Sequence, residues 1–150
     1  MDIKNKILNI ISPIIVQNNL LLIDLVVRGD ERKRIIEVFV DSKENISADL
    51  LADINRKINS SLNYNEEEFG NYRLDVSSPG VDRPLKYLEQ YYKHINRQFD
   101  LQFKDGNEIK KSKARLVSIN NDNLLFDDGM REFLIKYNQI IKAKVLISFS

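Results

Sequence analysis

The chain has 150 residues, 43% of them hydrophobic and 30% charged, a composition that indicates a folded globular protein and excludes a disordered one. It has no cysteine, which excludes disulfides, thiolate nucleophiles and cysteine-ligated metal centres, and His94 is its single histidine. The net charge is +1, but residues 1–86 carry 12 Lys and Arg against 14 Asp and Glu, whereas residues 87–150 carry 11 against 8. This asymmetry indicates that the C-terminal part is the side suited to a phosphate backbone, unless it is random scatter of surface charge.

The N-terminal part begins with a helix pattern followed by a strand pattern. Isoleucines at helical spacing predict an amphipathic helix over residues 2–17. Within it, Pro13 either makes a kink or opens a second short turn capped by Ser12. Two β-rich runs, residues 20–28 and 34–41, flank a charged turn and predict a hairpin.

A second helix is expected to begin at Ser47, whose hydroxyl can accept a hydrogen bond from a free amide of the first turn. Residues 63–71 contain three consecutive glutamates and are expected to form a polar loop. Residues 72–77 alternate apolar and charged side chains, as a strand with one buried face does. Two helices on a three-stranded sheet make a small α/β domain, so the fold class is α+β.

From residue 97 onward the pattern changes to short strands separated by tight turns. Five strands are expected, at residues 99–103, 114–119, 124–126, 131–135 and 140–146. Their near-regular spacing predicts a small β-barrel. We therefore expect an N-terminal domain over residues 1–86 and a C-terminal domain over residues 87–150, with a short linker helix within about residues 87–96.

No membrane or targeting segment is expected. The longest apolar stretch, Leu20 to Ile23, ends at Asp24 and is far shorter than the roughly 20 residues of a membrane span. The N-terminus has no cationic region that leads into an apolar run. We expect a cytoplasmic protein.

The run SSPGVDRPL, residues 77–85, is only partly explained by local structure. Pro79-Gly80 suits the two central positions of a type II turn, Asp82 can cap a following short helix, and Pro84 stiffens the exit. Three polar members need another reason: Ser77, Ser78 and Arg83. A guanidinium at position 83 can hold Asp75 or Asp82 and lock the angle between two domains, or it can reach a phosphate or a partner.

Catalytic and metal-binding hypotheses find little support in the sequence. Ser77 or Ser78 could act as a nucleophile, but the single histidine lies in the expected linker helix and no nucleophile elbow surrounds the serines. Four aspartates could be imagined as a magnesium site, although they lie on different elements and are better explained as caps and strand-edge charges: Asp24, Asp41, Asp75 and Asp82. We expect no catalytic residue, no cofactor and no metal.

The best candidate for contact with RNA is a basic run in the C-terminal part. Lys111, Lys113 and Arg115 fall on one face of a strand by its period of two, so three charges can follow a phosphate backbone. Spaced lysines also protect an exposed strand edge from pairing, which is the alternative. Phe99 and Phe103 share a strand face and are expected to be buried in the barrel, not to stack on bases.

The segment YRLDVSSPGVDRPL closely resembles the strand-and-turn motif of the RimP family of ribosome maturation factors. The resemblance continues over LLLIDLVVRGDERKRIIEVFVD, ISADLLADINRKINSSL and YNQIIKAKVLISF, and it is weakest over residues 104–135. At three places this chain lacks a glycine that is usual in the family: Asn18-Asn19, Asn96 and Ala114. Asparagine tolerates left-handed backbone, so we expect the first two departures to be mild, whereas Ala114 could shift a corner of the barrel.

The resemblance implies a fold and a function. Members have an N-terminal α/β domain and a C-terminal SH3-like barrel related in shape to Sm-type RNA binders. They bind the immature small (30S) ribosomal subunit, contact ribosomal RNA and a ribosomal protein of the decoding region, and assist late assembly without catalysis or cofactor. The SSPGVDRP run would then form a partner-binding or interdomain element of a monomer. Two alternatives stay open, an Sm-like RNA-binding ring and a small hydrolase that uses the serine pair.

Overall fold

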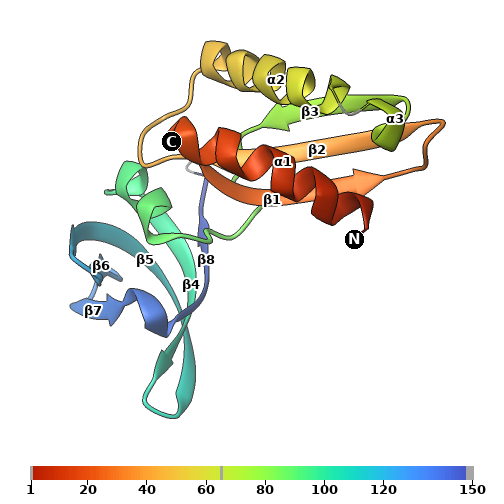
Figure 1. The fold of residues 1–150 in the computed structure, drawn as a ribbon. Coiled ribbons are helices and arrows are strands. Elements are labelled where there is room, and N and C mark those ends of the chain that lie inside the picture. Colours follow the sequence, from red (N-terminus) through yellow and green to blue (C-terminus); the bar gives the residue numbers. More distant parts are fainter. Residues whose placement is uncertain (1, 65, 148–150) are drawn as a thin grey trace. The chain divides into compact units, whose positions relative to one another are not determined.

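The computed structural model describes residues 2–64 and 66–147 and divides the chain into two compact units, the first ending at Pro79 and the second beginning at Gly80. The first unit combines helices with a three-stranded sheet and the second is built on a five-stranded sheet, so the expected α+β class is confirmed (Figure 1). Within the described residues, no helix has the length and apolar character to cross a membrane.

The sheet of the first unit has the order β1-β2-β3. Strands β1 (Leu21–Arg28) and β2 (Arg34–Asp41) form the predicted antiparallel hairpin, and β3 (Tyr72–Ser77) pairs with β2 in parallel. Alternate residues of β2 are buried, because only one face of the sheet meets the helices. A parallel pair needs a crossover connection, and the second helix supplies it.

Helix α1 (Ile3–Gln17) continues through Pro13, so of the two alternatives for this proline the second turn capped by Ser12 is wrong. The Ser12 hydroxyl instead donates a hydrogen bond to the Leu8 carbonyl oxygen at 2.7 Å. After the helix, Asn19 adopts a φ of 58°, the left-handed conformation that asparagine tolerates.

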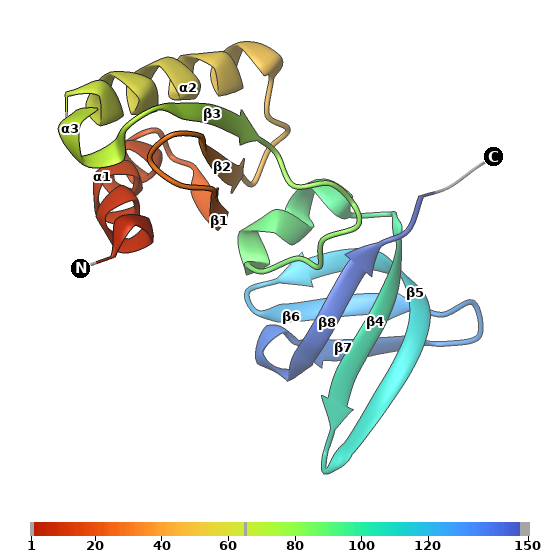
Figure 2. The same ribbon diagram turned by 90° about the vertical axis from the view of Figure 1, so that its right-hand side faces the viewer.

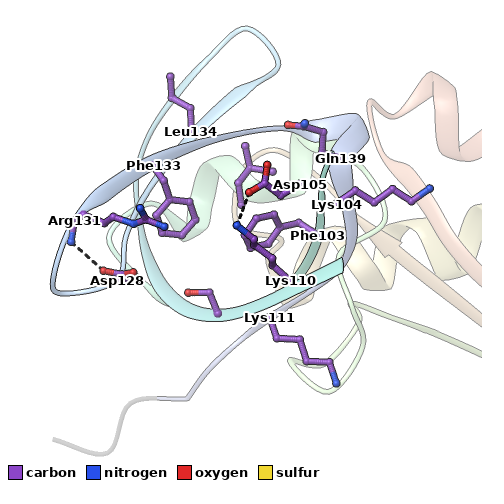
Figure 3. Close-up of a pocket in the computed structure, with 12 residues that line it drawn as sticks. Phe103, Lys104, Asp105, Lys110, Lys111, Asp128, Arg131, Phe133, Leu134 and Gln139 are labelled. Carbon is purple, nitrogen blue, oxygen red and sulfur yellow. Dashed lines mark hydrogen bonds and ion pairs between the residues drawn. The ribbon is translucent and has the colours of Figure 1, made fainter. Parts of the chain in front are cut away.

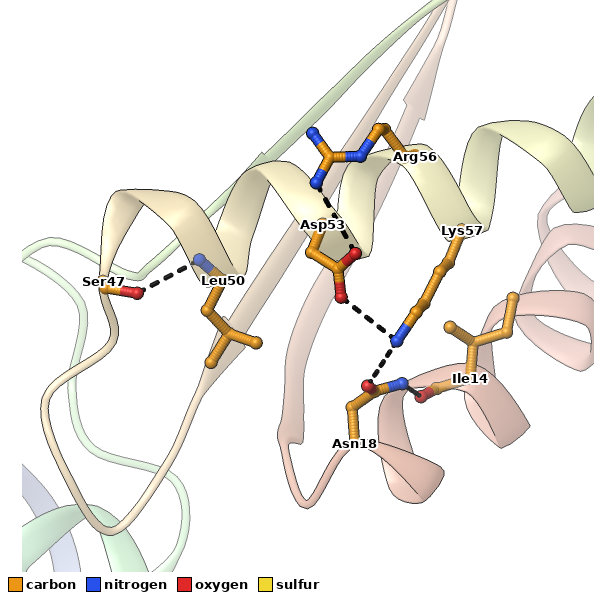
Figure 4. A network of polar contacts seen from close by, with 7 residues as sticks. All are labelled: Ile14, Asn18, Ser47, Leu50, Asp53, Arg56 and Lys57. Atoms are coloured by element: carbon orange, nitrogen blue, oxygen red, sulfur yellow. Dashed lines mark hydrogen bonds and ion pairs between the residues drawn. The ribbon is translucent and has the colours of Figure 1, made fainter.

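Helix α2 (Ala48–Asn63) begins as predicted, with the Ser47 hydroxyl accepting a hydrogen bond from the Leu50 amide at 3.1 Å. Figure 4 shows how its middle meets α1. The Lys57 ammonium lies 3.1 Å from an Asp53 carboxylate oxygen and donates to the Asn18 side-chain oxygen at 2.9 Å. The hydrogen bond from Lys57 lowers the pKa of Asp53. These polar contacts join the outer edges of the two helices above a shared apolar core.

The segment expected as a polar loop contains a short helix, α3 (Glu66–Phe69), so that prediction is wrong. Phe69 is fully buried in the core, and the Arg34 guanidinium donates a hydrogen bond to the Phe69 carbonyl oxygen. Gly70 follows with a φ of +65°, and a Cβ there would lie 2.5 Å from the Glu31 carbonyl oxygen. A four-residue helix is too short to have a periodic apolar pattern, so no local signal predicted it.

The second unit is an antiparallel sheet in the order β7-β6-β5-β4-β8. All five predicted strands are present, and β5 begins earlier than expected, so the basic run lies inside it. Their bounds are β4 (Gln98–Asp105), β5 (Glu108–Asn120), β6 (Asn123–Asp127), β7 (Glu132–Lys136) and β8 (Ile140–Val145). The β4–β5 hairpin extends beyond the other strands (Figure 2).

The expected closed barrel is not formed by the strand pairing. Strands β7 and β8 are the two edges of the sheet, separated by a 3-10 turn, η2 (Tyr137–Gln139), that leads β8 back to pair with β4. Every strand nevertheless contributes to one core, because the sheet is curled (Figure 2). Ala114 is fully buried within a regular stretch of pairing opposite Phe99, so its missing glycine does not disturb β5.

The segment before β4 packs into the second unit. It forms the expected short helix as a 3-10 helix, η1 (Leu88–His94), and the Gln90 side-chain oxygen accepts hydrogen bonds from the amides of Lys86 and Tyr87. The Leu85 amide donates to the Ala143 carbonyl oxygen of β8 at 2.8 Å. The domain boundary after residue 86 stays a prediction.

We expect a fragment of residues 80–150 to form a soluble β-rich domain. A fragment of residues 90–150 should be less stable, because it loses the hydrogen bond of Leu85 to β8 and the packing of Leu88 on the core. Circular dichroism and urea midpoints of the two fragments measure the difference. An unfolded 80–150 fragment, under conditions where the full chain folds, would show that the second unit does not fold independently.

Candidate functional site

The basic run lies on the outer face of β5, as predicted. Ala114 and Leu116 are fully buried, so the alternating side chains of Lys113 and Arg115 point away from the core. Lys111 continues the same face two residues earlier, and Figure 3 shows its side chain directed away from the neighbouring pocket. The sequence therefore placed these three cations on one face correctly.

The three cations have different surroundings. Lys111 and Lys113 are exposed, whereas Arg115 is half-buried and lies 3.5 Å from an Asp127 carboxylate oxygen. The Arg115 guanidinium also donates to the Asn96 side-chain oxygen at 3.2 Å, and Asn96 holds the left-handed conformation expected where the family has glycine. Arg115 is thus partly neutralised, and the two lysines carry most of the unbalanced charge of the row.

Sequence reasoning missed two lysines that lie beside this row. Strand β4 has β5 on one side and β8 on the other, and β8 presents Lys142 and Lys144 outward because Ala143 and Val145 are buried. The signal was the alternation in the IKAKV run. This alternation indicated that both lysines lie on the same face of their strand, but it did not indicate which strand lies beside them.

Lys110 belongs to the opposite side of β5. Its ammonium lies 2.6 Å from an Asp105 carboxylate oxygen, and this hydrogen bond lowers the pKa of Asp105. Both residues line an open pocket of about 250 Å³ (Figure 3). The aromatic wall of the pocket is a stacked pair, Phe103 and Phe133, with ring centroids 5.9 Å apart. Four cations and two carboxylates line the pocket, and one of the cations, Lys110, is paired with Asp105.

The expected burial of the two phenylalanines of β4 is confirmed at one position and partial at the other. Phe99 is fully buried, whereas Phe103 is half-buried at the rim of the core. Because its ring packs on Phe133, Phe103 is a wall of the pocket and not an exposed platform for a base.

The SSPGVDRPL run does not form the predicted turn. The Arg83 amide donates to the Gly80 carbonyl oxygen at 3.1 Å, so the turn is centred on Val81 and Asp82, and Gly80 does not have a positive φ. Asp82 does not cap the next helix either, because η1 begins at Leu88. The turn therefore lies two residues later in the chain than expected.

The polar members of this run differ in exposure. Ser77 ends β3 opposite Phe39 and is half-buried, as is Arg83, whereas Ser78 and Asp82 are exposed. Pro84 is exposed at the end of the turn.

The candidate catalytic and metal residues have local structural roles. The His94 ring meets the Phe99 ring edge to face, with centroids 6.3 Å apart. The Asp24 and Asp41 carboxylates accept hydrogen bonds from the amides that follow them, and Asp75 pairs with Arg73 at 3.1 Å. In the part of the chain that the structure describes, no three His, Cys, Asp or Glu residues gather as metal ligands would.

A family model for the RimP N-terminal domain matches residues 10–82. The matched region begins within α1 and contains the whole three-stranded sheet, α2 and the first part of the SSPGVDRPL run. The resemblance inferred from the sequence is therefore confirmed over residues 10–82 by an independent comparison. The chain therefore contains a RimP N-terminal domain, and this match supports its assignment to the RimP family of ribosome maturation factors.

Proposed function

We propose that this protein binds the immature small (30S) ribosomal subunit and assists its late assembly without catalysis. The observation that carries the proposal is the match of residues 10–82 to the RimP N-terminal domain. Two further observations support binding over catalysis. His94 is used in aromatic packing, and three of the candidate aspartates are occupied by local hydrogen bonds or an ion pair.

We further propose that the partners are ribosomal RNA and a ribosomal protein of the decoding region, and that the protein acts as a cytoplasmic monomer with no cofactor. The second unit is proposed to be an SH3-like domain. Its five antiparallel strands around one core, with a 3-10 turn before the last strand, support that architecture. The two units are proposed to act as separate domains, joined near residues 80–86.

Co-sedimentation through a sucrose gradient tests this function directly. We expect the full chain to migrate with immature small subunits and not with large subunits. Migration with neither particle, or equally with both, would contradict the proposal. Analytical ultracentrifugation of the free protein separates a monomer from an Sm-like ring.

The SSPGVDRPL run is the proposed contact or interdomain element. We expect Arg83→Ala to weaken binding to small subunits by about tenfold or more, because truncating a charged group in an interface leaves its partner unpaired. The free energy of unfolding should fall by less than about 2 kcal/mol, since no core volume is removed. Subunit binding and urea denaturation measure the two effects. A large loss of stability with unchanged binding would make Arg83 a structural residue only.

Gly80→Ala is a second probe of the same turn. Gly80 is exposed and does not need a positive φ, and nothing lies within 4 Å of an added Cβ. The variant should therefore fold normally. If it loses affinity for the subunit, the partner lies close to the turn. If only Arg83→Ala loses affinity, the contact is narrowed to the guanidinium.

A further inference from the structure

A lysine face is formed by Lys111 and Lys113 of β5 together with Lys142 and Lys144 of β8. Strand β4 lies between these two strands. Its Gln102 is paired with Lys111 on one side and Lys142 on the other, and its Asp100 is paired with Lys113 and Lys144. Directly paired residues of neighbouring strands point to the same side of a sheet. All four ammonium groups are therefore presented on one surface, although the sequence separates the two pairs by about 30 residues.

The spacing of the lysine face follows from the geometry of the sheet. Neighbouring strands lie about 4.8 Å apart, so the two rows of lysines are separated by about 10 Å at the backbone. Within each row the two lysines are about 7 Å apart along the strand. Four flexible side chains can thus approach a shared anion from both sides of β4.

The charge of this surface is not balanced within the chain. Asp100 is the one carboxylate that the pairing places among the four lysines, and none of these lysines forms an ion pair with another residue of the described segments. The other two cations of β5 are paired, Lys110 with Asp105 and Arg115 with Asp127. An anionic partner would supply the missing neutralisation.

The surface is also hollowed where the two rows face each other. A hollow of about 180 Å³ lies over β4, and three lysines line it together with Gln102 and Asp100. Since a water molecule occupies about 30 Å³ of the liquid, the hollow has room for a phosphate group. The Gln102 carboxamide can donate a hydrogen bond to a phosphate oxygen in its floor.

The side chains on this face suit a nucleic-acid backbone better than its bases. The outward residues of the three strands at this point are lysines, Gln102 and Asp100, whereas the aromatic side chains of β4 lie on the core side. Base recognition by stacking needs an aromatic platform, and backbone contacts need cations. The chemistry of the face is that of sequence-independent phosphate binding.

We propose that the lysine face binds the phosphodiester backbone of RNA, with one row of contacts from β5 and a second from β8. This proposal deepens the proposed function and rests on it for the identity of the RNA as ribosomal. The negative charge of Asp100, which lies between the two rows of lysines, weakens the binding of an anion. Lys142 and Lys144 contribute as much as Lys111 and Lys113, and Arg115 contributes less because Asp127 partly neutralises it.

The test is a titration of the full chain against a labelled RNA duplex and a labelled single-stranded oligouridine, from about 50 to 200 mM KCl. With about four phosphate contacts the slope of log affinity against log salt should be near −3, an affinity loss of about sixtyfold over this range. For the variant Lys142→Gln/Lys144→Gln the slope should be about −1.5. The same rise in salt should then weaken the binding of this variant only about eightfold. Lys111→Gln/Lys113→Gln should behave in the same way.

The matched control, Lys4→Gln/Lys136→Gln, removes two exposed lysines outside the face. Its slope should equal that of the wild type. Asp100→Asn should raise the affinity about two- to threefold at low salt, because it removes one negative charge beside two lysines. An increase of this kind cannot arise from partial unfolding. It therefore tests the face separately from the lysine variants.

Three outcomes would overturn the proposal. The first is parallel slopes for the lysine variants and the control, and the second is no gain in affinity for RNA from Asp100→Asn. The third is an affinity for oligoglutamate equal to that for RNA, which would indicate an acidic protein partner. Sedimentation with small subunits separates this failure from failure of the proposed function. If the wild type sediments with immature subunits and the slopes are parallel, the lysine face alone is rejected. If the slopes differ as expected and the wild type does not sediment with subunits, the proposed function is rejected and the RNA-binding face stands.

Discussion

Phe99→Ala is expected to lower the free energy of unfolding of the second unit by about 3 to 5 kcal/mol, the usual cost of emptying a buried aromatic site. Phe99 is fully buried at the centre of an aromatic cluster. Its ring stacks on Tyr91 with centroids 5.8 Å apart, and it meets the rings of His94 and Phe126 edge to face. The substitution removes contacts to η1 and to β6 at once, and rigid rings around the site cannot collapse into the cavity.

Urea denaturation followed by circular dichroism measures this loss, since the chain has no tryptophan to report on it. The matched control is Phe103→Ala, on the same strand and face. Phe103 is half-buried and packs on Phe133 at the rim of the core, so its loss should cost clearly less. An equal or larger effect at Phe103 would show that the core of the second unit is centred on the pocket and not on Phe99.

Phe69→Ala should destabilise the first unit by a similar amount, about 3 to 5 kcal/mol. Phe69 is fully buried although it belongs to a four-residue helix, α3. The Arg34 guanidinium holds the Phe69 carbonyl oxygen, and the Asn71 amide donates to the Glu31 carbonyl oxygen at 3.1 Å. These backbone contacts remain in the variant, so the segment cannot move inward to fill the space that the ring leaves.

The control for this second substitution is Tyr64→Ala. Tyr64 lies five residues earlier and is 91% exposed, so truncating its side chain should change stability by no more than about 0.5 kcal/mol. Hydrogen exchange of the β2 and β3 amides follows the stability of this unit alone. If the two variants exchange at the same rate, α3 does not hold the core of the first unit together.

The elements that could be predicted from the sequence alone are those in which local conformational preference and burial agree. The apolar periodicity of α1 and α2 marked both helices, because one stripe of each meets the sheet. The alternation in β3 reflects the same one-sided burial, whereas the cap at Ser47 follows from the hydrogen bond that its hydroxyl accepts from the Leu50 amide. At Asn19 and Asn96 the left-handed backbone followed from the residue type, since asparagine tolerates that conformation where most other side chains do not. The motif in residues 77–85 marked the family, but its turn was displaced because proline and glycine suit several turns.

Other features, such as the burial of Phe69 and the lysine face, depend on contacts between segments that are distant in the sequence. The burial of Phe69 depends on Arg34 and Glu31, which precede it by more than 30 residues, and no local pattern encodes those contacts. The same holds for the lysine face. The period of a strand sets the side of the sheet on which Lys111 and Lys142 lie, whereas only the pairing of β4 with both β5 and β8 makes them neighbours. Strand order is a global property of the fold, so the charges that share a surface can be found only once the sheet is assembled.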